Sequence, residues 1–169
     1  MTESTSPRVI EDVVELVQVL DLRGIQFVEF SAKRVDAAPE APEAPEAAEG
    51  LEADGREIGL AVAINKSTPT AFGQRFQMSI VDTQARYVFT VQSDYVSEEP
   101  IEFSEPVGRE FIERVAIMAV YPFFREAVIS AAGRLDVDVP VLGLLRSGQF
   151  KLPDPAELAD EAESTDAGT

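Results

Sequence analysis

The order of its periodic segments is the feature that most constrains how this 169-residue chain can fold. Four segments with the apolar–polar alternation of β-strands come first, and an apolar helical stretch follows them. The strand segments are Arg23–Arg34, Arg56–Lys66, Arg75–Asp82 and Tyr87–Gln92. Strands followed by helices in this way indicate an α+β fold, in which helices cover an antiparallel sheet.

The connections between these segments predict how the strands pair. Residues 67–70 and 83–85 are short links, so the second, third and fourth strands should form an antiparallel meander. The link of residues 36–55 is longer and can carry the chain across the sheet after the first strand. Within that first strand, Ile25 and Phe27 alternate, but Phe30 continues on the other parity, which predicts a β-bulge.

Two helical runs are expected after the strands, Arg109–Val120 and Phe123–Ala132. Pro122 separates them and should break or kink the helix, because proline has no backbone donor. Gly133 is a natural residue to end the second run. The acidic residues 97–106 that precede the helices contain two prolines and are predicted to be a loop.

The two ends of the chain flank a central domain of residues 22–152. Residues 1–21 are predicted to form an N-terminal helix that starts at Ser6 and Pro7, although the valines there also allow a strand. Residues 153–169 hold six acids and no base, and Ala156–Glu163 can form a short helix. Residues 36–55 repeat Ala-Pro-Glu three times, which is typical of a flexible, extended linker.

Composition excludes several classes of enzyme. The chain has no histidine and no cysteine, so it cannot contain a Ser-His-Asp or Cys-His arrangement, a zinc site of thiolates and imidazoles, or a disulfide. No phosphate-binding or dinucleotide-binding glycine pattern occurs either. We expect a protein that is not an enzyme and uses no cofactor or metal.

The net charge of −17 is concentrated in two segments. Residues 35–55 and 153–169 hold 13 acids between them, which leaves 18 acids and 14 bases elsewhere. Such a chain should not bind nucleic acid, which requires a basic patch. The sequence shows no signal peptide and no apolar run near the ~20 residues of a membrane span. We therefore expect a cytoplasmic protein without membrane insertion.

Aromatic and large apolar side chains recur through the predicted sheet and helices, and they are the candidates for a binding groove. Most could equally be core residues, but one sheet and two helices have difficulty burying them all. An exposed apolar patch of a few hundred Å² marks an interface or a groove. We expect Phe89 and Phe124 in particular to face it. The candidates are Phe27, Phe30, Phe76, Met78, Tyr87, Phe89, Val91, Tyr121, Phe123 and Phe124.

Residues 121–126, Tyr-Pro-Phe-Phe-Arg-Glu, and residues 133–135, Gly-Arg-Leu, followed by Pro140, carry a resemblance to a known family. Together with the segment order from Leu22 to Leu145, they resemble the SecB family, and most closely the SecB-like chaperones of toxin–antitoxin–chaperone systems. The resemblance implies a four-stranded antiparallel sheet with a crossover after strand one, a long kinked helix and a short C-terminal helix. It also implies a homotetramer (a dimer of dimers) that acts as an ATP-independent holdase for unfolded or nascent polypeptides.

The sequence departs from the family at the positions that dock the export ATPase. Export members read Asp-Ile-Ser-Phe-Glu in the first strand, whereas this chain has Gly-Ile-Gln-Phe-Val at residues 24–28 and Thr90 in the fourth strand. These changes favour an antitoxin as the client over export precursors, and both contexts stay open. The alternative function is an interaction module or regulator that binds one folded partner protein.

Overall fold

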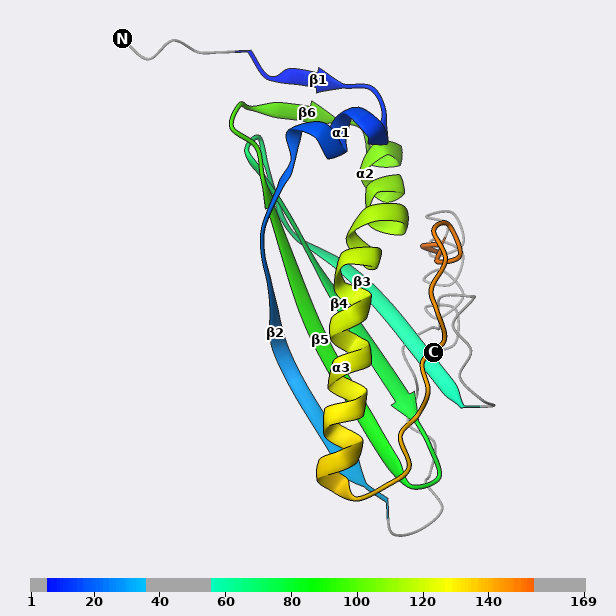
Figure 1. Cartoon of the computed structure of the whole chain (residues 1–169). Helices are drawn as coiled ribbons and strands as arrows, with labels where there is room; N and C mark the ends of the chain where they lie inside the picture. Colours follow the sequence, from blue (N-terminus) through cyan, green and yellow to red (C-terminus); the bar gives the residue numbers. More distant parts are fainter. Residues whose placement is uncertain (1–5, 36–55, 154–169) are drawn as a thin grey trace, which may run out of the picture.

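The computed structural model describes residues 6–35 and 56–153 and contains one antiparallel sheet of four strands (Figure 1). The strands are β2 (Asp21–Arg34), β3 (Glu57–Thr68), β4 (Ala71–Val81) and β5 (Ala85–Val96). Their order in the sheet is β2-β5-β4-β3, so the chain crosses from one edge to the other between β2 and β3. The α+β sheet with a crossover after its first strand is therefore confirmed.

Alternation along the strands decides which face of the sheet is buried. In the register, Leu60 lies opposite Met78, and Met78 lies opposite Phe89 in the next strand. All three side chains are buried against the helix that crosses this face. The intervening residues point to the opposite face and are polar in β4, where Arg75 and Gln77 alternate with the core positions.

A continuous helical stretch from Glu105 to Leu135 covers the apolar face. It consists of α2 (Glu105–Phe111), a π-helical turn η1 (Ile112–Ala116) and α3 (Ile117–Leu135). The prediction of two runs separated at Pro122 is wrong, because Pro122 lies inside α3. An internal proline costs about 3 kcal/mol. Burial of Val120, Tyr121 and Phe124 in the core, at roughly 2 kcal/mol for each side chain, outweighs that cost.

The helix also runs past Gly133, where its end was expected. The left-handed residue that terminates it is Asp136, with φ of 53°, and the Asp136 backbone N–H still bonds to the carbonyl of Ala132. Aspartate tolerates this left-handed conformation better than most residues because its short polar side chain can form local hydrogen bonds. Ala131 and Ala132 are fully buried, so packing of the last turn favours continuation of the helix.

Glu105–Leu135 is also the one helix among the described residues that is long and apolar enough to cross a membrane by length and composition. Half of the residues in its most apolar stretch are buried within the fold. A helix that covers a sheet in the core of a fold can be as apolar as a membrane-spanning helix, because the face that packs on the sheet must be apolar.

The N-terminus differs from the predicted helix of residues 1–21. Residues Arg8–Ile10 form strand β1, which pairs in parallel with β6 (Ile101–Phe103). The helix α1 is limited to Val13–Val19 and begins at Asp12, whose carboxylate accepts a hydrogen bond from the Glu15 backbone N–H at 2.8 Å. Residues 97–106, which were expected to be a loop, therefore contain the strand β6. The N-terminal residues pair with this strand instead of forming the first turns of a helix.

After α3 the chain turns back along the helix without forming another helix or strand up to Pro153 (Figure 1). We refer to residues 136–153 as the return segment. The side chains of Leu142, Leu145 and Phe150 in it are buried. The predicted linker at residues 36–55 and the predicted short helix Ala156–Glu163 lie outside the described residues.

Candidate functional site

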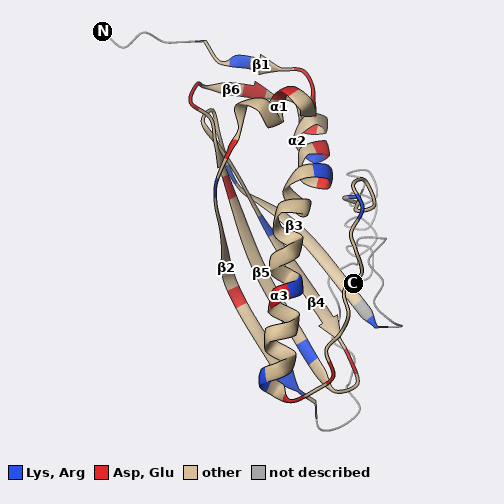
Figure 2. Cartoon of the chain, viewed as in Figure 1, with Lys and Arg blue, Asp and Glu red and all other residues tan. Residues whose placement is uncertain are grey.

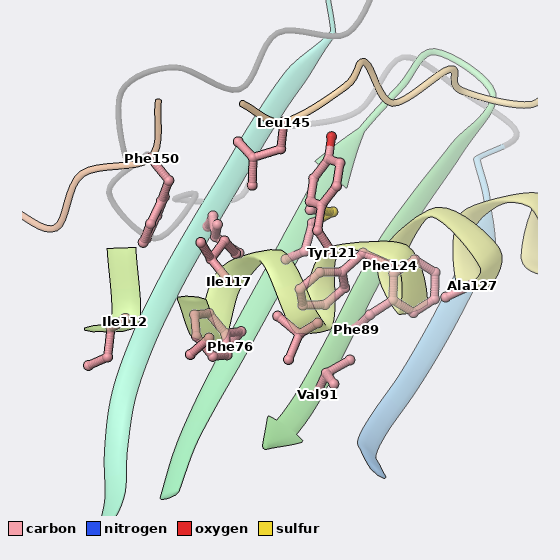
Figure 3. Close-up of a cluster of buried hydrophobic side chains, with 14 of the residues drawn as sticks. Phe76, Phe89, Val91, Ile112, Ile117, Tyr121, Phe124, Ala127, Leu145 and Phe150 are labelled. Atoms are coloured by element: carbon pink, nitrogen blue, oxygen red, sulfur yellow. The ribbon is translucent and has the colours of Figure 1, made fainter. Parts of the chain in front are cut away.

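The structure divides the ten aromatic and apolar candidates into two groups. Most are core residues of the covered sheet face, among them Phe89 and Phe124, which Figure 3 shows within the buried cluster between helix and sheet. The expectation that these two face a groove is wrong for this chain. The buried candidates are Phe76, Met78, Tyr87, Phe89, Val91, Tyr121 and Phe124.

The return segment adds to the burial of the candidates on one side of the helix. The sequence pattern indicated only one sheet and two helices as the material available for the core. The structure adds Leu145 and Phe150, which lie over Tyr121 and Ile117 on the side of the helix nearer β3 (Figure 3). An apolar segment without regular structure therefore completes the core that the helices alone could not.

Three of the candidates remain partly exposed and form an aromatic patch. Phe27, Phe30 and Phe123 expose 37%, 42% and 37% of their surfaces. The Phe27 ring centroid lies 5.7 Å from that of Phe30 and 6.4 Å from that of Phe123. The Arg134 guanidinium carbon lies 5.9 Å from the Phe30 ring centroid, within the range of a cation–π contact.

The β-bulge predicted in the first strand is present and creates this patch. The register of β2 against β5 shifts between Phe27 and Glu29, so that Phe27 pairs with Val91 and Phe30 with Phe89. Residues three apart in a regular strand point to opposite faces. The bulge at Val28 restores them to the same face, where both rings reach the helix side of the sheet.

An apolar cavity of about 620 Å³ lies at the other edge of the sheet, between β3, α2 and the return segment. Its volume is within the ~300–1,000 Å³ of pockets that hold small ligands. Glu105 and Arg109 add charge to a mainly apolar lining, in which Ser67 and Ser104 are the other polar side chains. The apolar side chains that line it are Leu60, Val62, Ile64, Phe72, Phe103, Ile112, Phe150 and Leu152.

Gly108 helps to keep this cavity open and lets α2 approach the sheet. A Cβ atom at Gly108 would lie 3.0 Å from the Cε2 atom of Phe103 and 3.8 Å from the Cζ atom of Phe72. Any side chain there would press on rings that line the cavity. The cavity could not be predicted from the sequence because its walls come from separate segments, and no local pattern connects Leu60 with Phe150.

The face of the sheet away from the helix is polar. The Thr90 hydroxyl donates to a Glu29 carboxylate oxygen at 3.1 Å, and the Arg75 Nε donates to the Gln92 side-chain oxygen at 2.8 Å. Gln92 in turn donates to Asp94 at 2.9 Å. Thr90 stands where export members of the family carry an acid. Its side chain contacts Glu29, which supplies an acid on the neighbouring strand.

Tyr121 connects the central part of α3 to the return segment. Its hydroxyl donates to the Gly143 carbonyl at 2.9 Å, and burial raises the pKa of this phenol. Tyr87 and Tyr95 are also buried, and burial raises the pKa of each. The described residues contain no group of three histidine, cysteine, aspartate or glutamate side chains placed to hold a metal ion.

These features define the class of fold. A four-stranded antiparallel sheet with a crossover, covered on one face by a long helix, is the SecB-like fold. The structure is similar to the SecB-like chaperone of Mycobacterium tuberculosis in complex with a ChAD peptide from the HigA1 antitoxin, with a TM-score of 0.57 and 19% identity. The match covers 78% of this chain and 94% of that chain.

The sequence comparison agrees with the fold. The chain is 29% identical over 162 residues to the SecB-like chaperone SmegB of Mycolicibacterium smegmatis, which covers 96% of this chain and 100% of the relative. No family model matches the chain. The chain is thus a homologue of a SecB-like chaperone along nearly its whole length, and its homologues are named for a class of proteins that are not enzymes.

Proposed function

We propose that this protein is an ATP-independent chaperone that holds apolar segments of unfolded or nascent polypeptides. The observation that carries the proposal is the open apolar cavity of about 620 Å³ beside an edge strand. The aromatic patch is a second apolar surface, at the opposite edge of the sheet. Exposed apolar surface of this kind is expected where a protein binds other chains.

The cavity suits an extended client. Among the described strands β3 pairs only with β4, which leaves the outer edge of β3 able to hydrogen-bond to a client backbone. Side chains of that client could then enter the cavity that Leu60, Val62 and Ile64 of β3 line. Phe27, Phe30 and Phe123 remain candidates for a second client contact.

For the client we propose an antitoxin with an apolar extension, held in the cytoplasm. The M. tuberculosis protein was solved with a peptide from an antitoxin, which supports this class of client. The absence of acids at Gly24, Val28 and Thr90 also favours it over delivery to the export ATPase. Export is the second candidate, because Glu29 and Asp94 do place acids on the polar face of the sheet.

We also propose that the protein assembles as a homotetramer, a dimer of dimers. Met118 and Ile129 are exposed on the outer side of α3. Between Ile117 and Gly133 the helix carries only two charged residues, Arg125 and Glu126, whereas α2 is densely charged (Figure 2). A helix that is apolar on both sides requires a partner on its outer side, and other copies of this chain can provide it.

The function is tested by the aggregation of a chemically denatured client followed by light scattering. The protein should suppress aggregation at stoichiometric amounts in the absence of nucleotide. Unchanged scattering would remove the holdase proposal. Tight binding to one native protein, without any effect on unfolded clients, would favour the alternative of a regulator with a folded partner.

The client class is tested by co-expression with an antitoxin that has an apolar C-terminal extension. We expect the antitoxin to co-purify with the protein, and a version without the extension to be lost. Strong binding to the export ATPase together with no retention of the antitoxin would reverse the order of the two candidates.

A further inference from the structure

Two side chains of the helix bind both backbone groups of Leu152 in the return segment. The Leu152 N–H donates to Glu113 Oε1 at 2.9 Å, and Arg109 Nη2 donates to the Leu152 carbonyl at 3.2 Å. Arg109 Nη2 also donates to the Pro153 carbonyl at 2.7 Å. The side chains of the helix therefore bind the backbone of Leu152 on both of its polar groups, as the backbone of a neighbouring β-strand would.

Glu113 depends on these partners. It lies in the π-helical turn η1 and is buried, with an exposed fraction of 8%. A buried carboxylate is tolerated only when its oxygens are bound. Leu152 binds Oε1, and the Lys151 ammonium binds Oε2 at 2.9 Å. Both partners come from the return segment, so the acid in the helix and the position of the segment require each other.

The residues held in this way form one wall of the apolar cavity. Phe150, Leu152 and Pro153 line it from the return segment and face the side chains of β3 and α2. This part of the segment has no helix or strand of its own, and it contains a turn in which the Gln149 N–H donates to the Arg146 carbonyl at 3.0 Å. Its distance from β3 therefore depends on the groups that bind it to the helix, in addition to the packing of the buried Phe150 side chain.

We propose that Glu113 and Arg109 form a latch that fixes this wall, so that Glu113 controls client affinity without lining the cavity. Glu113 is then a positioning residue, since it acts through Leu152. The inference rests on the proposed function only for its effect on clients, because the latch and the cavity exist in the chain without one. Charge-assisted hydrogen bonds such as these are stronger than neutral ones, which suits a latch that stays closed.

The experiment compares Glu113→Ala, Glu113→Gln and Lys151→Met with Glu110→Ala as the matched control. Glu110 is also a glutamate of the same helical stretch and is also ion-paired, with Arg114 at 2.9 Å, but that pair is exposed and does not involve the return segment. Each variant is examined for amide hydrogen exchange at Leu152, for its urea unfolding midpoint, and for the affinity of a fluorescent peptide rich in Phe and Leu.

In Glu113→Ala the Leu152 amide should exchange roughly tenfold faster, the loss expected for a hydrogen bond to a charged acceptor. The peptide should bind about tenfold more weakly, while the chain remains folded. Glu113→Gln should restore most of the affinity, because its amide oxygen can still accept from Leu152. Lys151→Met should lie between these two, and this variant should fold as the unmodified protein does because the Lys151 side chain is exposed. Glu110→Ala should match the unmodified protein in all three measurements.

Unchanged exchange at Leu152 in Glu113→Ala would overturn the latch. Faster exchange with unchanged peptide affinity would overturn its role in client binding. If the unmodified protein fails to bind the peptide while Leu152 responds as expected, the proposed function is lost and the latch stands.

Discussion

The Tyr121 hydroxyl donates a hydrogen bond to the carbonyl of Gly143 at 2.9 Å and so joins the middle of the core helix to the segment that returns along it. Tyr121 begins the Tyr-Pro-Phe-Phe-Arg-Glu stretch, and Gly143 lies between the buried residues Leu142 and Leu145. The start of the stretch that carries the resemblance to SecB-like chaperones is thus bonded to the return segment, three residues after Pro140.

Removal of this hydroxyl should destabilise the protein. We expect Tyr121→Phe to lower the free energy of unfolding by about 1 kcal/mol, since the Gly143 carbonyl loses its donor. Urea unfolding followed by circular dichroism measures the change. The matched control is Tyr87→Phe, because the buried Tyr87 hydroxyl has no hydrogen-bond partner among the described residues and its loss should cost nothing. Equal effects of the two substitutions would contradict the assigned role of the bond.

The core aromatics and the patch aromatics should respond differently to truncation. Phe89→Ala and Phe124→Ala each leave a cavity in the core and should cost about 3–5 kcal/mol in unfolding free energy. Phe123→Ala, at a partly exposed position, should cost less than about 1 kcal/mol. Thermal unfolding of the three variants measures this. A stable, folded Phe89→Ala would show that this ring is not a core residue.

A charge at the apolar cavity should weaken client binding without unfolding the chain. Ile64 lines the cavity and exposes 57% of its surface, so Ile64→Asp should be folded but should bind an apolar peptide at least about tenfold more weakly. Leu22→Asp is the control, since Leu22 lies on the opposite edge strand and is 47% exposed. Fluorescence anisotropy of a labelled peptide compares them. Equal losses would place the client elsewhere.

A charge on the outer side of α3 should disrupt the proposed tetramer. Ile129 is 58% exposed there, and Ile129→Asp should shift the mass measured by sedimentation equilibrium from four copies to two or one. The unmodified protein sedimenting near its monomer mass of 18.4 kDa would rule the tetramer out. A stable dimer would keep the fold and remove the second interface.

Stability should fall at high pH because burial raises the pKa of all three tyrosines above the ordinary 10.0. The unfolded chain then loses these protons at lower pH than the folded chain. Their contribution is complete below pH 10.0 and is lost as the pH rises through the folded pKa values. The chain has no tryptophan, so tyrosinate absorbance reports the ionisation directly. Ordinary titration of all three in the native protein would contradict this.

Local pattern determined the sheet. Alternation along Arg56–Lys66 predicted a strand, in which Ile58 and Leu60 are buried on one face, and the short links predicted the meander. The change of parity between Phe27 and Phe30 predicted the bulge at Val28. These features could be predicted because the direction of a strand side chain depends on its position in the strand, whatever lies opposite.

Tertiary contacts decided what covers that sheet. The pairing of Arg8 with Ile101 in β1 and β6 joins segments far apart in the chain, so no local signal distinguishes that strand from a first turn of helix. The helix continues through Pro122 because its packing against the sheet outweighs the free-energy cost of an internal proline. From the sequence alone, that proline predicts a break in the helix. Phe89 and Phe124 became core residues because the helix packs on this face of the sheet, and Leu145 and Phe150 return to cover Tyr121 and Ile117.

The sequence by itself thus determined the four strands of the main sheet, their alternation and the α+β class of the fold, all of which follow from short-range periodicity and the order of the segments. Only the tertiary structure decided which apolar residues stay open, because exposure depends on what the rest of the chain places over a residue. The apolar cavity is the clearest case: β3, α2 and residues 150–153 enclose it together, and none of them shows it alone.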